Sequence, residues 1–278
     1  MTNDSDKVQR YYRNYGEWHR LVKDPYHSLE FETTLRSLQR FLPRRGLILD
    51  AGGGPGRYTI ALAKQGYEMV LLDITPELLM EARIRVRRSG VKDRVREIVR
   101  GSIDNLSHFE NHTFDAVLCL GGPLGHMRDQ RLRGRALHEL GRVAKADAPI
   151  FVSVIGRYSL MIDAAVRFPS NLGLEPAMYQ RILTTGDYDG HAGFAPCHFF
   201  ALDELRASVE KQGWTVMEAV GLEGLASHHR VEMNQLARRH PRSWETLKRI
   251  HFATCTEPAV VATSEHFMIV ARAPNQSN

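Results

Sequence analysis

Residues 47–56 read Leu-Ile-Leu-Asp-Ala-Gly-Gly-Gly-Pro-Gly, a short apolar run followed by an acid and a cluster of glycines. The apolar run predicts a buried strand, and the glycines predict a tight turn, because glycine adopts backbone conformations that other residues avoid. Glycine at positions 52, 54 and 56 also lets backbone amide groups come close to a ligand. A turn between the first strand and the first helix of an α/β sheet is the usual place for a nucleotide-like ligand.

Strands and helices continue to alternate on the C-terminal side of this turn. Apolar runs predict five strands, at 47–50, 69–73, 95–99, 114–120 and 149–155. Helical patterns lie between them, at 57–65, 76–88 and 129–143. Strands that are apolar nearly throughout and separated by helices indicate a parallel sheet covered on both faces. With two further strands at 214–220 and 266–272, the expected fold is α/β: a Rossmann-like, doubly wound, mostly parallel seven-stranded sheet.

The segments outside this alternating region have a different organisation. Residues 1–46 are expected to form an N-terminal helical cap, and residues 47–278 one α/β domain. Insertions at about 158–198 and 223–262 follow the fifth and sixth strands. They combine helical stretches with a loop rich in Gly, Asp and His, and we expect them to pack over the core as a lid.

Composition excludes several classes of protein. The 278 residues are 43% hydrophobic and 25% charged, which excludes wholesale disorder and collagen-like repetition. Three widely spaced cysteines argue against a disulfide scaffold or a zinc ribbon, and His228, His229 and His266 lack a carboxylate or cysteine at a matching spacing, so no metal is expected. Without a secretory signal or an apolar run of about 20 residues, we expect a cytoplasmic protein with no membrane partner.

The spacing of the glycines distinguishes between families of nucleotide-binding turns. A P-loop needs Gly-Lys-Ser/Thr, which this turn does not contain. A dinucleotide fingerprint needs a third glycine or alanine at the position that Thr59 occupies. What remains is an acidic residue followed by glycine at every second position.

The pattern Asp50-x-Gly52-x-Gly54-x-Gly56 resembles the first motif of class I S-adenosylmethionine-dependent methyltransferases. Later motifs of that family map in order to the ends of the second, third and fourth strands, at Asp73, at Gly101-Ser102-Ile103-Asp104 and at Leu120-Gly121-Gly122-Pro123. The resemblance implies a methyltransferase domain over 47–278, S-adenosyl-L-methionine as the cofactor and S-adenosyl-L-homocysteine as the product.

The resemblance also implies which residues hold the cofactor. Asp50 would contact its methionine portion, Asp73 both ribose hydroxyls, and Ile74 the face of the adenine. Many relatives carry an acid where this chain has Ser102, while the amide of Ile103 remains able to contact the ring. The full set of expected cofactor-binding residues is Tyr15, Asp50, Gly52, Gly54, Gly56, Asp73, Ile74, Ser102, Ile103 and Leu120.

Looser similarity extends beyond this core. The segments 11–18, 152–166 and 202–221 look similar to tRNA wobble-uridine carboxymethyl methyltransferases. Within the first of them, Tyr11, Tyr15 and Trp18 have helical spacing. They form either a flap over the cofactor, with a tyrosine hydroxyl at the methionine carboxylate, or a helix that packs on the core by its aromatic face.

Three residues are candidates for work on the methyl acceptor. His126 follows the fourth strand and His198 precedes the helix at 202–211, and histidine serves as a base near neutral pH. Arg157 follows the fifth strand, where it would hold an acidic acceptor or form a surface ion pair.

The preferred hypothesis is an enzyme that methylates a small molecule enclosed by the lid. The alternative is a methyltransferase that modifies tRNA, with the arginines at 83–100 and 128–135 contacting phosphates. A net charge of +5 permits either partner. A third possibility is a protein that binds S-adenosylmethionine without turnover.

Overall fold

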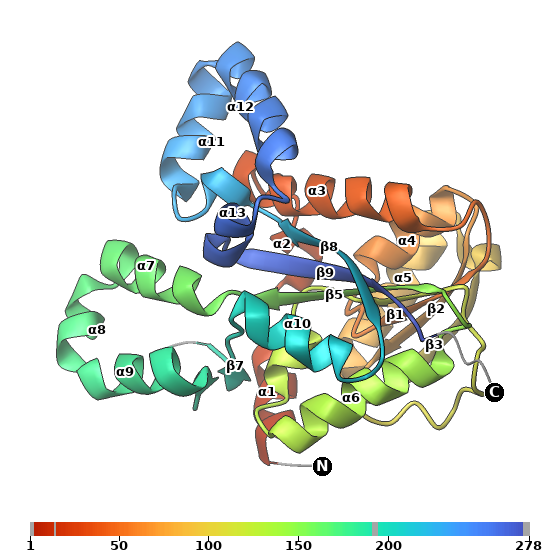
Figure 1. Ribbon diagram of the computed structural model, residues 1–278. Helices are drawn as coiled ribbons and strands as arrows, with labels where there is room; N and C mark the ends of the chain where they lie inside the picture. The colour runs from red at the N-terminus through yellow and green to blue at the C-terminus, as the bar shows by residue number, and fades with distance from the viewer. Residues whose placement is uncertain (1–2, 14, 191–193, 275–278) are drawn as a thin grey trace.

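The computed structural model describes residues 3–13, 15–190 and 194–274. A central sheet carries helices on both faces, and two groups of helices from the second half of the chain project at one side of it (Figure 1). None of the helices in the described ranges combines the length and the apolar character that crossing a membrane requires.

Seven strands form the sheet, in the order β3-β2-β1-β4-β5-β9-β8. They are β1 (Leu47–Ala51), β2 (Glu68–Asp73), β3 (Val95–Arg100), β4 (Ala116–Cys119), β5 (Pro149–Ile155), β8 (Thr215–Gly221) and β9 (His266–Arg272). The first five run parallel to one another, whereas β9 lies antiparallel to both β5 and β8. The prediction of a mostly parallel, doubly wound, seven-stranded sheet is confirmed.

Two layers of helices bury the faces of this sheet, because successive residues of a strand point to opposite sides. One face is covered by α3 (Pro25–Phe41), α4 (Arg57–Lys64) and α5 (Pro76–Arg88), and the other by α6 (Gln130–Val143) and α10 (Leu202–Glu210). In β2, Met69 packs with the first set of helices, and its neighbour Val70 belongs to the cluster on the opposite face.

The remaining elements precede the sheet or extend from its later strands. The N-terminal elements are α1 (Asn3–Arg13) and α2 (Glu17–Arg20), and the short helices η1 (Lys92–Arg94) and η2 (Pro123–His126) precede β3 and follow β4. Between β5 and α10 lie α7 (Arg157–Arg167), α8 (Pro169–Leu174), α9 (Pro176–Thr185), β6 (Asp187–Tyr188) and β7 (Cys197–His198). Between β8 and β9 lie η3 (Gly224–Ala226), α11 (Arg230–Arg239), α12 (Pro241–Thr254) and α13 (Pro258–Thr263).

One part of the first insertion differs from expectation. The sequence predicts a loop after residue 183, but β6 and β7 pair there as an antiparallel ladder, with Asp187 opposite His198. Two residues per strand are too few for an alternating pattern, so this pairing leaves no signal in the sequence.

The strand order changes direction at β1, whose neighbours are β2 on one side and β4 on the other. Chains that leave the carboxyl ends of β1 and β4 turn to opposite faces of the sheet, which opens a crevice between them. The glycine turn follows β1 directly and therefore lies at this crevice.

Candidate active site

The glycine turn takes a conformation that requires glycine. Gly52, Gly54 and Gly56 have φ angles of +82°, +54° and +83°, in the left-handed region. The amides of Gly52 and Gly53 donate to the carbonyl of Leu72 at 2.7 and 3.2 Å, which ties the turn to β2. A Cβ on Gly52 would lie 2.4 Å from Cγ of Pro123, so neither the backbone nor the space admits a side chain.

Asp50 lies beneath this turn. Its Oδ2 accepts hydrogen bonds from the amide and the hydroxyl of Thr59, at 3.1 and 2.6 Å, and its buried Oδ1 has no partner. Burial raises the pKa of this carboxyl to about 6. Asp50 is absent from the lining of the crevice, and so is Gly56, which caps α4. The structure therefore places both residues in support of the turn, and the prediction that Asp50 contacts the cofactor, directly or through water, stays a prediction.

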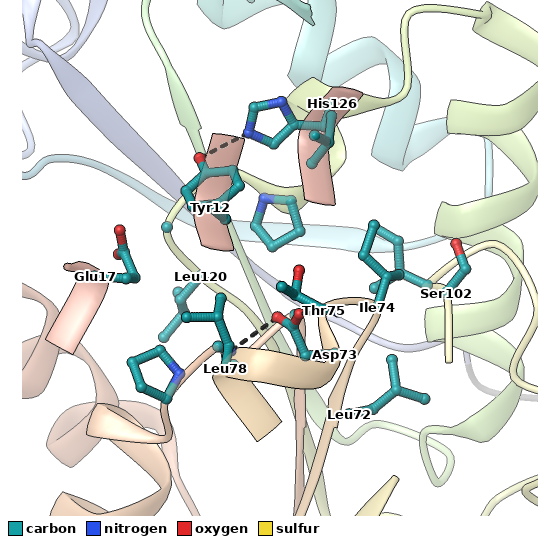
Figure 2. A pocket seen from close by; sticks show the side chains of 18 of the residues that line it. Tyr12, Glu17, Leu72, Asp73, Ile74, Thr75, Leu78, Ser102, Leu120 and His126 are labelled. Carbon is teal, nitrogen blue, oxygen red and sulfur yellow. Dashed lines mark hydrogen bonds between the residues drawn. The ribbon is translucent and has the colours of Figure 1, made fainter. Parts of the chain in front are cut away.

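Asp73, at the end of β2, faces the crevice. Its Oδ2 accepts from the amide of Gly54 at 2.9 Å and its Oδ1 from the amide of Thr75 at 2.8 Å (Figure 2). Burial raises the pKa of this carboxyl. The two backbone bonds fix the orientation of the carboxylate and leave lone pairs for two further donors.

The crevice, which we call the first cleft, holds about 1020 Å³. Most of the predicted cofactor-binding residues line it, namely Gly52, Gly54, Asp73, Ile74, Ser102, Ile103 and Leu120. Thr75, Leu78 and Ser102 line the cleft with Asp73, and Figure 2 shows Thr75 and Leu78 beside Asp73 and Ser102 beyond Ile74. The hydroxyl of Ser102 donates a hydrogen bond to the carboxylate of Asp104, the acidic residue of this segment.

The N-terminal helices supply a wall of the first cleft that the motifs did not reveal. Tyr12 on α1 and Glu17 and Arg20 on α2 line it. Arg20 donates to Glu17 at 2.8 Å and to Glu30 at 2.6 and 3.0 Å, so its charge is neutralised within the wall. The second oxygen of Glu17, Oε2, is buried without a partner.

A second cleft, of about 1530 Å³, adjoins the first. Tyr12, Glu17, Arg20 and Gly121 line both and mark the junction. Aromatic side chains from the N-terminal segment and from the insertion after β5 line it, namely Tyr12, Tyr15, Tyr26, Phe168, Tyr179, Tyr188, Phe194 and Phe199. Charged side chains line it as well, namely Glu17, Arg20, Lys23, Glu30, Asp163, Arg167, Glu223, Arg230 and Glu265. Tyr15 lines only this second cleft, so the structure does not place it at the cofactor as predicted.

A buried charge cluster lines the second cleft and reaches the junction through Arg20. His266, the first residue of β9, bonds through Nδ1 to Glu223 at 2.7 Å and lies 3.9 Å from Glu30. Burial alone would lower the pKa of His266, but Glu223 and Glu30 raise it to about 9. Glu30, Glu223 and His266 are close enough together to suit a metal ion, which their separation along the chain concealed. Arg20 and protonated His266 already balance the two carboxylates, so the geometry is that of an ion-pair network.

His126 lies at the mouth of the first cleft, where Figure 2 shows it facing Tyr12. Its Nε2 is 2.8 Å from the hydroxyl of Tyr12, and its Nδ1 is 3.0 Å from the carbonyl of Pro196. Burial lowers the pKa of His126, so its imidazole is neutral near pH 7.

The other two candidates for work on the acceptor, His198 and Arg157, lie outside both clefts. His198 bonds Asp187 at 2.7 Å and Glu204 at 2.6 Å, which occupies both ring nitrogens. Arg157 pairs with Glu204 and donates to the carbonyl of Phe199 at 3.1 Å. Neither residue lines a cleft, so both hold the start of α10 against the first insertion. This differs from the predicted role of His198 at the acceptor, whereas for Arg157 the structure has the ion pair that was the alternative to such a role.

A comparison with known protein families indicates which kind of domain contains this crevice. Residues 48–147, from β1 to the segment before β5, match the family model described as "Methyltransferase domain". This stretch of the chain is thus similar to a methyltransferase domain.

Individual proteins similar to this chain are methyltransferases as well. The chain is 29% identical over 165 residues to a glycine/sarcosine N-methyltransferase of Aphanothece halophytica, across 58% of this chain and 59% of that protein. It is 22% identical over 247 residues to a tRNA 5-carboxymethoxyuridine methyltransferase of Escherichia coli K12, across 87% and 86%. The fold matches a SAM-dependent methyltransferase structure from Methanosarcina mazei with a TM-score of 0.58 and 19% identity, over 86% of this chain and 97% of that one.

The cofactor of the methyltransferase domain is S-adenosylmethionine, which supplies a methyl group carried on a sulfonium. The residues of the first cleft fit it. Asp73 offers a fixed carboxylate for a ribose, Ile74 and Leu78 give an apolar wall, and the glycine turn lets the backbone come close. The unpartnered oxygen of Glu17 is a buried acceptor suited to an ammonium group.

Proposed function

We propose that this chain is an S-adenosylmethionine-dependent methyltransferase whose acceptor is a small molecule bound in the second cleft. The junction of the two clefts carries this proposal, because a methyl group must pass directly from donor to acceptor. The second cleft offers both aromatic and charged side chains, which suit a small molecule with apolar and polar parts.

In this proposal the chain binds the methyl donor and the acceptor, orients them for transfer and excludes water. Asp73 and Glu17 hold the donor, and the glycine turn admits it. The helices α7–α9, with Phe194 and Phe199, enclose the acceptor on the far side of Tyr12. A dry, aligned site accounts for most of the rate in a displacement with so good a leaving group.

The test is transfer of a labelled methyl group from S-adenosylmethionine to fractionated cell extract. We expect label in a low-molecular-mass fraction and none in the RNA fraction. Label in RNA alone would replace the proposal with tRNA modification. Tight cofactor binding with no label in any fraction would favour a protein that binds the cofactor without turnover.

Modification of tRNA is the second candidate, since one relative that aligns along most of the chain is a tRNA methyltransferase. The arginine-rich segments bear on it. Arg85 pairs with Glu81, Arg96 with Glu68, and Arg135 with Asp104, and phosphates would have to displace those carboxylates.

The dependence of tRNA binding on ionic strength distinguishes the two candidate functions. Binding of tRNA would weaken steeply as ionic strength rises, since each phosphate contact releases a counterion. We expect no such binding, and a steep salt dependence of a measured tRNA affinity would favour the second candidate.

A further inference from the structure

Among the Phe, Tyr and Trp residues in the described part of the chain, Tyr12 is the only one that lines both clefts. It projects from α1, and Figure 2 shows its hydroxyl directed to the imidazole of His126. Tyr12 and His126 are 114 positions apart in the sequence. They meet because α1 packs against η2, whose last residue is His126. If the methyl group passes between the clefts, a side chain common to both lies beside the reacting atoms.

The hydrogen bonds of His126 determine where its proton is. The carbonyl of Pro196 has no proton to donate, so Nδ1 of His126 must be the donor of their 3.0 Å bond. In a neutral imidazole the other nitrogen then carries a lone pair. Nε2 therefore accepts from the hydroxyl of Tyr12 at 2.8 Å.

The hydroxyl of Tyr12 donates one hydrogen bond to His126, and its oxygen remains able to accept a hydrogen bond from another group. A phenolic hydroxyl donates once and accepts as well, and its one proton is already committed to His126. Any donor that approaches from the clefts thus meets an acceptor backed by a neutral base. Among the described residues, the groups in contact with His126 are the Tyr12 side chain from α1, the Phe194 ring and the Pro196 carbonyl, and these three are uncharged.

Burial acts on both partners in the direction that a relay needs. It lowers the pKa of His126, which keeps the imidazole neutral and able to take a proton at pH 7. It raises the pKa of Tyr12, with Glu17 adding to the increase and Arg20 opposing it, so the phenol stays protonated. A phenol that does not ionise passes a proton on only while it receives another.

We propose that Tyr12 and His126 form a proton relay, in which the hydroxyl of Tyr12 takes the acceptor's proton as its own moves to Nε2 of His126. This inference rests on the proposed function. As a bond forms between the acceptor atom and the methyl carbon, the carbon–sulfur bond breaks and sulfur keeps its electron pair. The acceptor's proton stays on the oxygen of Tyr12, and the proton that Tyr12 gave up makes His126 an imidazolium, from which water later removes one proton.

The relay defines the chemical class of the acceptor. A carboxylate or a tertiary amine has no proton to lose and needs no base. A hydroxyl, or an amine that still carries hydrogen, loses one proton for each methyl gained. The nucleophile is therefore a group of this protonated class, on a molecule that fits among the aromatic walls of the second cleft.

Nitrogen NMR of histidine-labelled protein tests the relay without any acceptor. Among the 13 histidines, His126 is assigned by its loss in His126→Gln. We expect Nδ1 protonated and Nε2 unprotonated at about pH 7.5, with titration below the ordinary value. Tyr12→Phe should shift the Nε2 resonance toward that of a free nitrogen. A proton on Nε2 in the wild-type protein would overturn the relay.

Single-turnover methylation of the labelled fraction tests its part in the reaction. Tyr12→Phe and His126→Gln should each slow the transfer by about 100-fold or more, with donor affinity within about threefold of wild type. Tyr67→Phe, which removes a hydroxyl bonded to the carbonyl of Pro43 outside both clefts, is the matched control and should keep the wild-type rate. The wild-type rate should fall at acidic pH as His126 is protonated, and His126→Gln should lack this inflection.

The outcomes separate the relay from the proposed function. Wild-type transfer that persists in Tyr12→Phe at full rate would overturn the relay and leave the methyltransferase intact. Absence of transfer by the wild-type protein would instead count against the proposed function, and the NMR result would still decide the hydrogen bond on which the relay depends.

Discussion

Two buried aspartates at neighbouring strand ends show how local surroundings separate structural from binding roles. Asp50 turns beneath the glycine turn and is satisfied on one oxygen by Thr59. Asp73 is held by two backbone amides and faces the first cleft. We therefore propose that Asp73, whose carboxylate is fixed and faces the cleft, is the one that binds the ligand.

Removal of the Asp73 carboxylate should therefore weaken the binding of S-adenosylhomocysteine. We expect Asp73→Ala to reduce the affinity at least about tenfold, since a charge-assisted hydrogen bond contributes roughly 1.5–3 kcal/mol. Isothermal titration calorimetry measures this, with Asp93→Ala, an exposed acid of η1, as the control. A folded Asp73→Ala protein with wild-type affinity would contradict the assignment.

The charge of His266 should make stability depend on pH. Its folded pKa, about 9, lies above the unfolded value near 6.5, so its contribution is complete below about pH 6.5 and is lost as pH rises to about 9. Denaturant unfolding across this range should show a decline of up to about 1.4 kcal/mol per pH unit that is absent from His266→Gln. Equal slopes in the two proteins would contradict the ion-pair network with Glu223 and Glu30.

Single residues also show where inference from sequence ends. Asp73 was predictable because its place at a strand end is local information. His198 and Arg157 were assigned to the acceptor by the same reasoning, but both side chains turn to Glu204, a partner that only the folded chain reveals. Position at an edge of the sheet does not determine which way a side chain points.

At the level of elements, the glycine turn and the two helices that precede α3 make the first cleft together. The turn was predictable from its spacing, since its conformation is fixed by residues adjacent in sequence. The wall from α1 and α2 was not, because nothing in an aromatic helix specifies which surface it covers. Tyr12 and Glu17 therefore emerged only from the structure.

Gly52→Ala should disrupt the turn. The left-handed backbone and the 2.4 Å approach to Pro123 both oppose a methyl group, and together they should lower the free energy of unfolding by about 2 kcal/mol or more. Gly134→Ala is the matched control, since it lies within α6 with no atom near its added methyl and should be neutral or stabilising by about 0.5–1 kcal/mol. Thermal and denaturant unfolding measure both, and equal effects would contradict the account of the turn.

For the whole molecule, the N-terminal segment closes over a sheet that belongs to a distant part of the sequence. Asp4 pairs with Arg128, Arg13 with Glu77, and Tyr12 with His126. Residues of α1 also line the first cleft, so a ligand there adds contacts to this helix. We therefore expect ligand binding to stabilise α1.

Hydrogen exchange should show this coupling. Saturating S-adenosylhomocysteine should slow amide exchange in α1 and in the glycine turn, because exchange requires local opening that the ligand opposes. α12, which packs with α11 and η3, is the internal control and should be unchanged. Unchanged exchange in α1 at saturation would show that the helix does not enclose the ligand.

The measurement that tests the account most directly is a crystal structure with S-adenosylhomocysteine bound. It should show the ribose on Asp73, the adenine beside Ile74, and the sulfur at the junction within reach of the Tyr12 side chain. An empty first cleft at saturating ligand, or a sulfur atom directed away from the second cleft, would contradict it.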